Sequence, residues 1–234
     1  MKRRIYSFVA IVIVSYVLPV RATTRTWDND SADGKWSTAA NWSGDARPIP
    51  GDDVVFDATS TANCAADVVS NNLASITLAA GYGSSVTFPA NAVQGGMVLT
   101  VSGDVIVNSG NLIFTGDTTV LNGGAGGNPW GIGYTINADN VTIASGASIN
   151  ADGLGFAVNA GPGKPAYSTR GGSHGGEGGG LVANYAPPIL YGSIYGPTTL
   201  GSGGNANPGG GAIKITATGT VTVNGRLSAD GQYT

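Results

Sequence analysis

The chain has 234 residues, of which 39 are glycine and 11% are charged, and its formal net charge is −3. The glycine content is more than twice the usual share of about 7% and disfavours long helices. A chain with 11 basic and 14 acidic residues has no basic surface for nucleic acids or anionic membranes. Short runs of Val, Ile, Leu and Thr recur, so the chain has apolar surface to bury and is not expected to be disordered.

The N-terminus has the layout of a secretory signal peptide. Residues 1–4 are positively charged, residues 5–20 are almost entirely apolar, and Ala22 supplies the small residue before a cleavage site at Thr23. We expect residues 1–22 to be removed. An uncleaved anchor is the alternative, but the apolar run is shorter than the roughly 20 residues that span a bilayer. The sequence therefore predicts a secreted or cell-surface protein without membrane insertion after signal removal.

Residues 23–53 form a tryptophan-rich segment that contains Trp27, Trp36 and Trp42. Packed together, these indoles would cap the end of a stacked β structure, which otherwise presents unpaired backbone groups. Exposed, they could stack on sugars. We favour the cap and keep the three indoles as candidate glycan-binding residues.

Residues 54–153 contain short runs of β-branched or aromatic residues bounded by Gly, Asn, Asp or Ser, which is typical of strands and tight corners. The expected strands are residues 54–56, 76–78, 86–88, 98–101, 105–107, 112–114 and 119–121. From Val98 onward the runs begin about every seven residues, with a glycine in nearly every heptad. That glycine excludes a coiled coil, because each one costs about 1 kcal/mol in a helix.

Three such strands with their corners make a layer of about 21 residues, the unit of a stacked solenoid. The fold class expected is therefore all-β, a right-handed parallel β-helix with an N-terminal cap. A β-sandwich is the alternative, because the Asn-Gly and Asp-Gly pairs of this chain also mark hairpin turns.

An internal repeat supports stacking. Residues 141–153 recur, with small length changes, as residues 221–231, and two copies of one strand-corner-strand unit imply neighbouring layers. Residues 154–211 between them are predicted to be a long Gly-rich insertion that leaves the stack and returns near the same corner. Its Tyr191 and Tyr195 are further candidate glycan-binding residues. Residues 212–234 are expected to begin another layer that is cut short.

These segments carry a resemblance to known proteins. Residues 36–53, with Phe56, Asn63, Cys64 and residues 80–82, resemble the N-terminal module of large bacterial cell-surface and autotransporter-like β-helix proteins. Residues 171–180, 191–197 and 209–231 are similar to a Gly-rich module of large extracellular repeat proteins. The resemblance implies a surface β-helix with an adhesive role. The sequence stops at Thr234 soon after a repeat unit, which favours a fragment or a short member.

Catalysis has little support in the sequence, and we expect no catalytic residues, no metal and no cofactor. The single histidine, His174, is surrounded by glycines, so a structural role is favoured over that of a general base. Lys214 alternates with apolar neighbours and is expected to face solvent, and Cys64 is expected to be a buried thiol. The predicted function is a structural or adhesive module whose partner is an extracellular glycan or a host or neighbouring cell surface. A glycan-binding module and the N-terminal part of a carbohydrate-active enzyme are the alternatives.

Overall fold

The computed structural model describes residues 22–120, 130–166, 170–179, 189–193 and 195–232. The apolar part of the expected signal peptide and residue 121 of the strand expected at 119–121 lie outside the described residues. Within the described part the chain has strands β1 to β14 and one 3-10 turn, Ala39–Asn41. No α-helix occurs in these residues, as predicted. None of the helical structure described there is long and apolar enough to cross a membrane.

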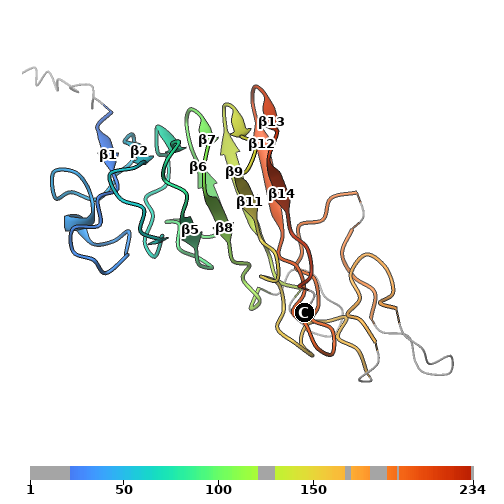
Figure 1. Cartoon of the computed structure of the whole chain (residues 1–234). Helices are drawn as coiled ribbons and strands as arrows, with labels where there is room; N and C mark the ends of the chain where they lie inside the picture. The colour runs from blue at the N-terminus through green and yellow to red at the C-terminus, as the bar shows by residue number, and fades with distance from the viewer. Residues whose placement is uncertain (1–21, 121–129, 167–169, 180–188, 194, 233–234) are drawn as a thin grey trace, which may run out of the picture.

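The strands form three sheets (Figure 1). The six-stranded sheet contains, in spatial order, β1 (Thr24–Thr26), β2 (Asp53–Phe56), β4 (Ser75–Leu78), β7 (Val105–Val107), β10 (Val141–Ile143) and β13 (Val221–Val223). The five-stranded sheet contains β3 (Cys64–Ala65), β5 (Ser85–Phe88), β8 (Asn111–Phe114), β11 (Ser148–Asn150) and β14 (Arg226–Ser228). The three-stranded sheet contains β6 (Val98–Thr100), β9 (Tyr134–Ala138) and β12 (Ile213–Ala217).

Every pair of neighbouring strands in these sheets is parallel. From β4 onward, consecutive strands belong to the six-, the five- and the three-stranded sheet in turn, up to β14. Each strand therefore pairs with strands one turn of the chain away. Hairpins give antiparallel pairs, so the alternative of a hairpin-built β-sandwich is wrong. Of the seven predicted strands, the first six match β2, β4, β5, β6, β7 and β8 to within one residue.

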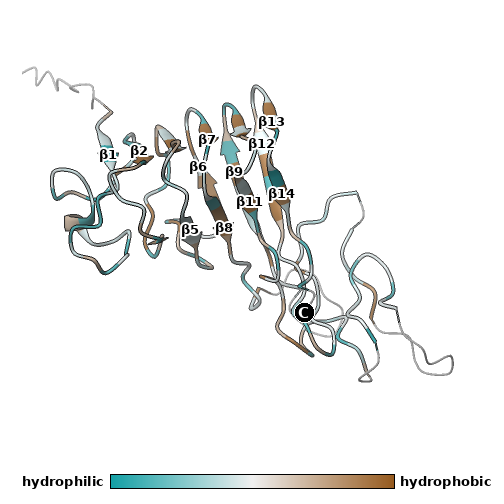
Figure 2. Cartoon of the chain, in the orientation of Figure 1, coloured by the Kyte–Doolittle hydropathy of each residue, from teal (hydrophilic) through white to brown (hydrophobic). Residues whose placement is uncertain are grey.

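One face of each strand fills the interior of the stack. In β2, Val54 and Phe56 are buried and their neighbours are partly exposed, the alternation expected of a strand with one buried face. Strands β4, β5, β7 and β8 repeat it, and most strands carry apolar residues (Figure 2). Because pairing is in register, like side chains stack between layers: Phe88 lies opposite Phe114, with ring centroids 4.7 Å apart.

The layers vary in length, and only the layer that begins at β2 is close to the predicted length of about 21 residues: Val54 of β2 pairs with Ile76 of β4, 22 residues further along the chain. The later layers are longer. Val105 of β7 pairs with Ile76 of β4 on one side and with Val141 of β10 on the other. The prediction of a strand at residues 119–121 is also wrong for residues 119 and 120, which the structure describes. Asp117 accepts hydrogen bonds from the Thr119 amide at 2.8 Å and from the Thr119 hydroxyl at 2.6 Å, which holds the chain in a turn.

The tryptophan-rich segment covers the β1 and β2 end of the stack (Figure 1). The indoles of Trp27 and Trp36 lie 5.2 and 4.7 Å from that of Trp42, edge to face, and all three pack on Phe56 of β2. Trp42 Nε1 donates to the Trp36 carbonyl at 2.8 Å. All three indoles are fully buried. They form the predicted cap, and the alternative that Trp27, Trp36 and Trp42 bind glycans is wrong because no ring face is accessible.

A hydrogen-bonded carboxylate closes the loop of the cap. The Lys35 amide donates to Asp33 Oδ1 at 3.0 Å, the Thr38 hydroxyl donates to Oδ2 at 2.7 Å, and Asn41 Nδ2 donates to Oδ1 at 2.6 Å. These donors, the Lys35 amide foremost, favour the ionised form and lower the pKa of Asp33 well below its usual value of 3.8.

Acid is therefore expected to weaken the cap. Because the pKa of Asp33 is lower in the folded than in the unfolded chain, its carboxylate stabilises the fold above about pH 4, and this contribution is lost as the pH falls further. The unfolding midpoint (Tm) measured by calorimetry should drop less between about pH 6 and pH 3 in Asp33→Asn than in the original chain. Equal drops in the two proteins would contradict this account.

The two copies of the internal repeat occupy equivalent places in neighbouring layers. Val141, Thr142 and Ile143 of β10 lie opposite Val221, Thr222 and Val223 of β13, and β11 pairs in the same way with β14. The sequence prediction of stacked repeat units is therefore confirmed.

The Gly-rich residues 154–211 contribute no strand in their described part. Their ends lie close together, as predicted: the Gly211 amide donates to Ala151 O at 2.8 Å, and the Gly155 amide donates to Gly209 O at 2.9 Å. Side chains are excluded where the backbones cross, because a Cβ on Gly203 or Gly209 would overlap a backbone carbonyl oxygen. The segment has its own small apolar cluster, which contains Phe156 and Leu200.

Replacing residues 154–211 by a short Gly-Ser linker is expected to leave the stack folded. The large apolar cluster of the stack contains no side chain from the described part of these residues, and the cost of closing a loop depends only weakly on its length. The losses are a few hydrogen bonds, such as Leu200 N–H to Trp130 O, of about 0.5–1.5 kcal/mol each. Circular dichroism and limited proteolysis beside the original chain measure the effect. Loss of the β signal would show that the segment builds the stack.

Candidate functional site

An open cleft of about 740 Å³ lies between the Gly-rich segment and the last layer of the stack. One wall carries His174, Glu177, Thr199 and Asn207 together with many glycine backbones. The other wall comes from β12 and from the chain that follows β14, including Gln232. It is larger than two other hollows in the described residues, which have volumes of about 460 and 360 Å³.

Glycine packing shapes the wall of this cleft. The Gly201 amide donates to Gly210 O at 2.9 Å, and the Phe156 amide donates to Gly201 O at 3.0 Å. A Cβ on Gly172 or Gly210 would overlap the carbonyl oxygen of a crossing segment. The chain therefore presents backbone groups and short side chains to the cleft, because the backbones approach too closely for larger ones.

The buried Tyr191 side chain forms hydrogen bonds that link residue 191 to residues 200–202 in the wall of the cleft. The Tyr191 hydroxyl donates to Leu200 O and shares a hydrogen bond of 2.8 Å with the Ser202 hydroxyl. Burial raises the pKa of Tyr191 to about 12, so the phenol stays protonated at neutral pH. Its ring also packs edge-on against the His174 ring, with centroids 5.0 Å apart.

His174 is partly buried and is held in place by this arrangement. Its Nε2 lies 2.9 Å from the Thr199 hydroxyl. Burial lowers the pKa of His174 below its usual 6.5, and the contact with Thr199 opposes that shift. The imidazole is therefore neutral at neutral pH, and its partners are a hydroxyl and a phenol ring. The structural role of His174 stays a prediction.

The carboxylate in the cleft wall is also engaged. Glu177 pairs with Arg170 at 3.1 Å, and it is the one acidic residue that lines the cleft in the described part of the chain. With hydroxyls, amides and carbonyls on its walls, the cleft can offer hydrogen bonds to an uncharged polar ligand. A mechanism with two carboxylates, as glycoside hydrolysis needs, is not supported by this arrangement.

A shallower hollow lies on the outer side of the five-stranded sheet and is lined by Asn111, Ser148, Asn150 and Arg226. These polar residues bond to one another: the Ser148 hydroxyl donates to Asn111 Oδ1 at 2.7 Å, and Asn150 Nδ2 donates to the Ser148 hydroxyl at 2.9 Å. The first of these bonds joins β11 to β8 of the neighbouring layer and helps to hold the two strands together, whereas the second lies within β11.

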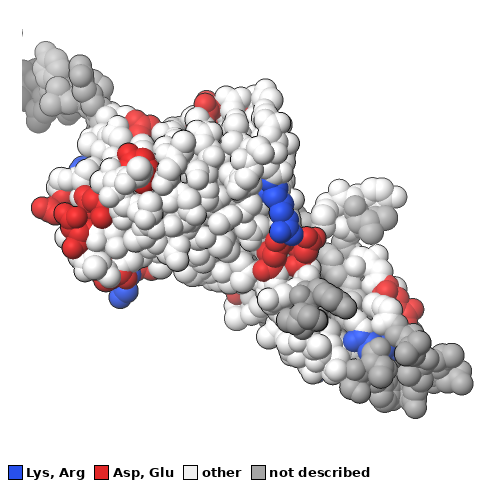
Figure 3. Space-filling view, in the orientation of Figure 1, with Lys and Arg blue, Asp and Glu red and all other residues white. Residues whose placement is uncertain are grey.

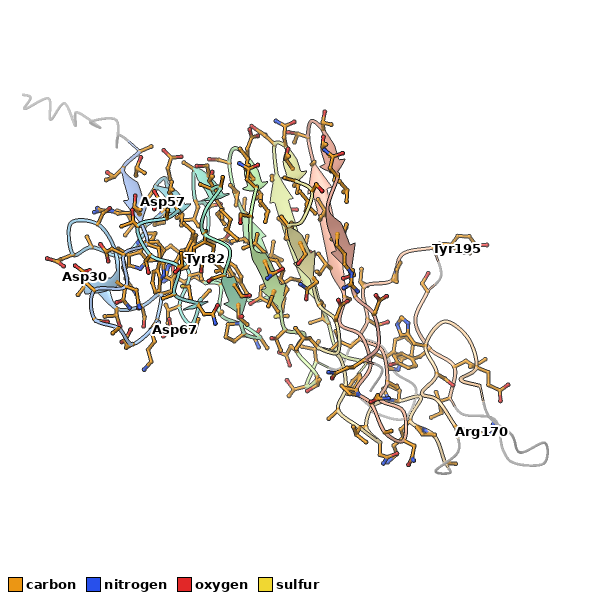
Figure 4. All side chains as sticks on the ribbon, viewed as in Figure 1. Asp30, Asp57, Asp67, Tyr82, Arg170 and Tyr195 are labelled. Atoms are coloured by element: carbon orange, nitrogen blue, oxygen red, sulfur yellow. The ribbon has the colours of Figure 1, made fainter. Side chains whose placement is uncertain are left out.

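The residues selected from the sequence do not meet at one site. Tyr191 is buried, whereas Tyr195 is almost fully exposed and projects away from the stack (Figure 4), so the two do not form a joint sugar platform. Ala22 and Thr23 are exposed at the start of the described chain. Cys64 is buried, as predicted, and burial raises the pKa of its thiol. Lys214 on β12 faces solvent, as predicted.

No signal in the sequence points to the cleft itself. Thr199, Asn207 and Gln232 are ordinary polar residues in Gly-rich surroundings, and they approach one another only after the chain has folded back on the last layer. No local spacing or motif marks them.

No protein-family model, curated protein or solved structure matches this chain. The resemblance to bacterial surface proteins therefore stays a prediction, and the argument for function depends on the residues of this chain alone.

Proposed function

We propose that the chain is a secreted or cell-surface structural module with an adhesive role and no catalytic activity, built as a right-handed parallel β-helix. The observation that carries the proposal is the cyclic order of the strands from β4 onward, in which consecutive strands join the six-, the five- and the three-stranded parallel sheet in turn. Apolar side chains in such a stack are covered by the neighbouring layers. The sequence thus builds a long, stiff surface rather than one deep pocket.

Two further observations support an extracellular location of the protein. The signal-peptide layout of residues 1–22 predicts export, and the charged residues, 11% of the chain, leave a surface that is largely neutral where Figure 3 displays it. The indole cap closes the first end of the stack, as a module that begins a stacked protein requires.

Export is tested by expressing the full chain with a C-terminal tag in a bacterial host with a general secretory pathway. Mass spectrometry of the exported protein should find an N-terminus at or near Thr23. An Ala22→Arg variant, which places a large charged residue before the cleavage site, should accumulate as the precursor. Retention of the original chain in the cytoplasm with Met1 in place would overturn the extracellular assignment.

Adhesion is tested with beads coated with the exported protein. The beads should bind intact bacterial or host cells more than beads coated with the heat-unfolded protein do. Equal binding of the two preparations would overturn the adhesive role and leave only a structural one.

Glycan binding is a second candidate, and the polar lining of the cleft is the observation that favours it. An uncharged saccharide could hydrogen-bond to Asn207, Gln232 and the glycine carbonyls. A polysaccharide array probed with the exported protein tests this, with Gln232→Ala as the variant expected to bind more weakly and Gln94→Ala, which lies outside the cleft, as the control. Binding that is unchanged in Gln232→Ala would place the glycan elsewhere.

A further inference from the structure

A buried carboxylate lies beside the residue that becomes the N-terminus if the leader, residues 1–22, is removed. Asp52 directly precedes β2, and its side chain is 2% exposed. The backbone nitrogen of Thr23 donates to Asp52 Oδ1 at 3.3 Å. Thr23 is also the residue at which the signal-peptide layout predicts cleavage. The carboxylate therefore contacts the backbone nitrogen whose chemistry changes when the leader is cut off.

Backbone hydrogen bonds hold this arrangement in place. The Asp53 amide donates to the Thr23 carbonyl at 3.0 Å, and Thr24 of β1 begins its parallel pairing opposite Asp53 of β2. On the other side, the Asp52 carbonyl accepts from the Ala74 amide at 2.8 Å, directly ahead of β4. Asp52 is thus attached to the first three strands of the six-stranded sheet, and it cannot move away from Thr23 without loss of these bonds.

The two oxygens of Asp52 have different partners. Oδ2 accepts from the Ile49 amide at 3.1 Å and from Arg25 Nε at 3.4 Å. Arg25 also donates to the Ser43 carbonyl, and its side chain is 19% exposed, so water screens part of its charge. The Thr23 nitrogen bonds to Oδ1 instead. Arg25 therefore compensates the carboxylate only in part, and it does so through the oxygen that Thr23 does not use.

We propose that the Asp52 carboxylate binds the α-ammonium group that leader removal creates on Thr23, and that this ion pair completes the cap. The proposal rests on the export and cleavage of the proposed function. Hydrolysis of the bond between Ala22 and Thr23 consumes one water molecule and leaves a carboxylate on the leader and an ammonium on Thr23. An α-amino group is largely protonated at neutral pH, and a neighbouring carboxylate favours its charged form further.

Cleavage strengthens the contact in two ways. The nitrogen changes from a neutral donor into a cation, and its attraction to a buried anion is screened less than that between two surface charges. The ammonium also rotates freely, so it can approach Oδ1 more closely than an amide nitrogen held in the chain. Because β1 leads directly into Trp27 of the cap, the cap reaches its full stability only after the leader has been removed.

A thermodynamic cycle isolates this ion pair. Protein that begins at Thr23 is released from a fusion by a protease that leaves no extra residue. It is compared with protein that has two glycines before Thr23, which place the ammonium up to about 7 Å further along the chain. Both N-termini are combined with Asp52 and with Asp52→Asn, and the cycle cancels the contact of Asp52 with Arg25. Urea unfolding followed by circular dichroism measures all four proteins.

The two glycines should raise the unfolding equilibrium constant about five- to tenfold when Asp52 is present, and less than about twofold in Asp52→Asn. Asp30→Asn is the matched control, because Asp30 is an exposed carboxylate on the outer loop of the cap (Figure 4). In that variant the glycines should have the same effect as in the original chain. Should Asp52→Asn not fold, NMR titration of the chain with Asp52 decides: the pKa of the α-amino group should be higher on Thr23 than on the added glycine.

Each of three results would overturn the proposal. They are equal stability of the two N-termini with Asp52 present, an equal effect of the glycines with and without Asp52, and an α-amino pKa that is no higher on Thr23. Exported protein that begins at another residue would overturn it as well. Failure of the proposed function is distinguishable, since it appears as retention of the chain with Met1 in place while the purified proteins still give the expected coupling.

Discussion

Replacing Trp42 by alanine is expected to lower the free energy of unfolding by about 3–5 kcal/mol. Trp42 is fully buried, lies between Trp27 and Trp36 and also packs on Phe56, the inward residue of β2, with ring centroids 5.6 Å apart. The substitution leaves a cavity at the centre of the cap and removes the indole N–H that donates to the Trp36 carbonyl. Urea unfolding followed by circular dichroism measures the change.

Two variants separate the cap from a general effect of losing an indole. Trp130→Ala removes a partly buried indole that packs on Tyr191 in the Gly-rich region, and a smaller loss is expected there. Trp36→Phe keeps an aromatic ring and loses no hydrogen bond, because Trp36 Nε1 has no partner among the described residues. A Trp42→Ala variant within about 0.5 kcal/mol of the original chain, the range of neutral surface changes, would show that the cap does not stabilise the stack.

The strands of the stack were predictable because each one carries its own signal. Val105–Val107 and Leu112–Phe114 place large apolar residues on the inner face and end at residues suited to corners, and period-two burial is a property of the strand alone. The internal repeat predicted that residues 141–143 stack on residues 221–223, because two segments with the same pattern of apolar residues can occupy equivalent positions in neighbouring layers.

The length of the layers was not predictable from these signals. Between β8 and β9 the chain makes an excursion that includes the turn at Asp117, so Val105 meets Val141 rather than a residue one short layer away. The aspartate side chain competes for the backbone amide of Thr119, and this local bond outweighs the strand propensity of the residues that follow. The corners and the longer connections between strands thus vary in length, while the paired strands stay in register.

The candidate cleft could not have been found in the sequence. Its walls depend on contacts between residues far apart in the chain, such as the His174 ring with the Thr199 hydroxyl. The glycines that permit those contacts resemble ordinary loop glycines in the sequence, because what sets them apart is the lack of room for a Cβ. The exposure of Val221 and Val223 was likewise not predictable, since they have the same sequence pattern as their buried partners.

Replacing Gly133 by alanine is expected to destabilise the stack by about 3 kcal/mol, the upper end of the usual cost of overpacking. A Cβ at this position would overlap the Ala212 carbonyl oxygen and would lie 2.6 Å from the Ala212 Cβ. The same carbonyl accepts a hydrogen bond of 3.0 Å from the Tyr134 amide, at the start of the β9 and β12 pair. The overlap involves backbone atoms, so a change of rotamer cannot relieve it and the two strands must separate.

The destabilisation by Gly133→Ala is expected to begin where β9 pairs with β12, so a second measurement can locate it. Hydrogen exchange should show a greater loss of amide protection in β12 than in β7, because β12 has β9 as its one strand neighbour whereas β7 is paired on both sides. Gly176→Ala is the matched control, since a Cβ there meets no atom within 4 Å and should change stability by no more than about 0.5 kcal/mol. If Gly133→Ala unfolds at the same urea concentration as this control, β9 and β12 can separate without cost, and close packing at Gly133 does not stabilise their pairing.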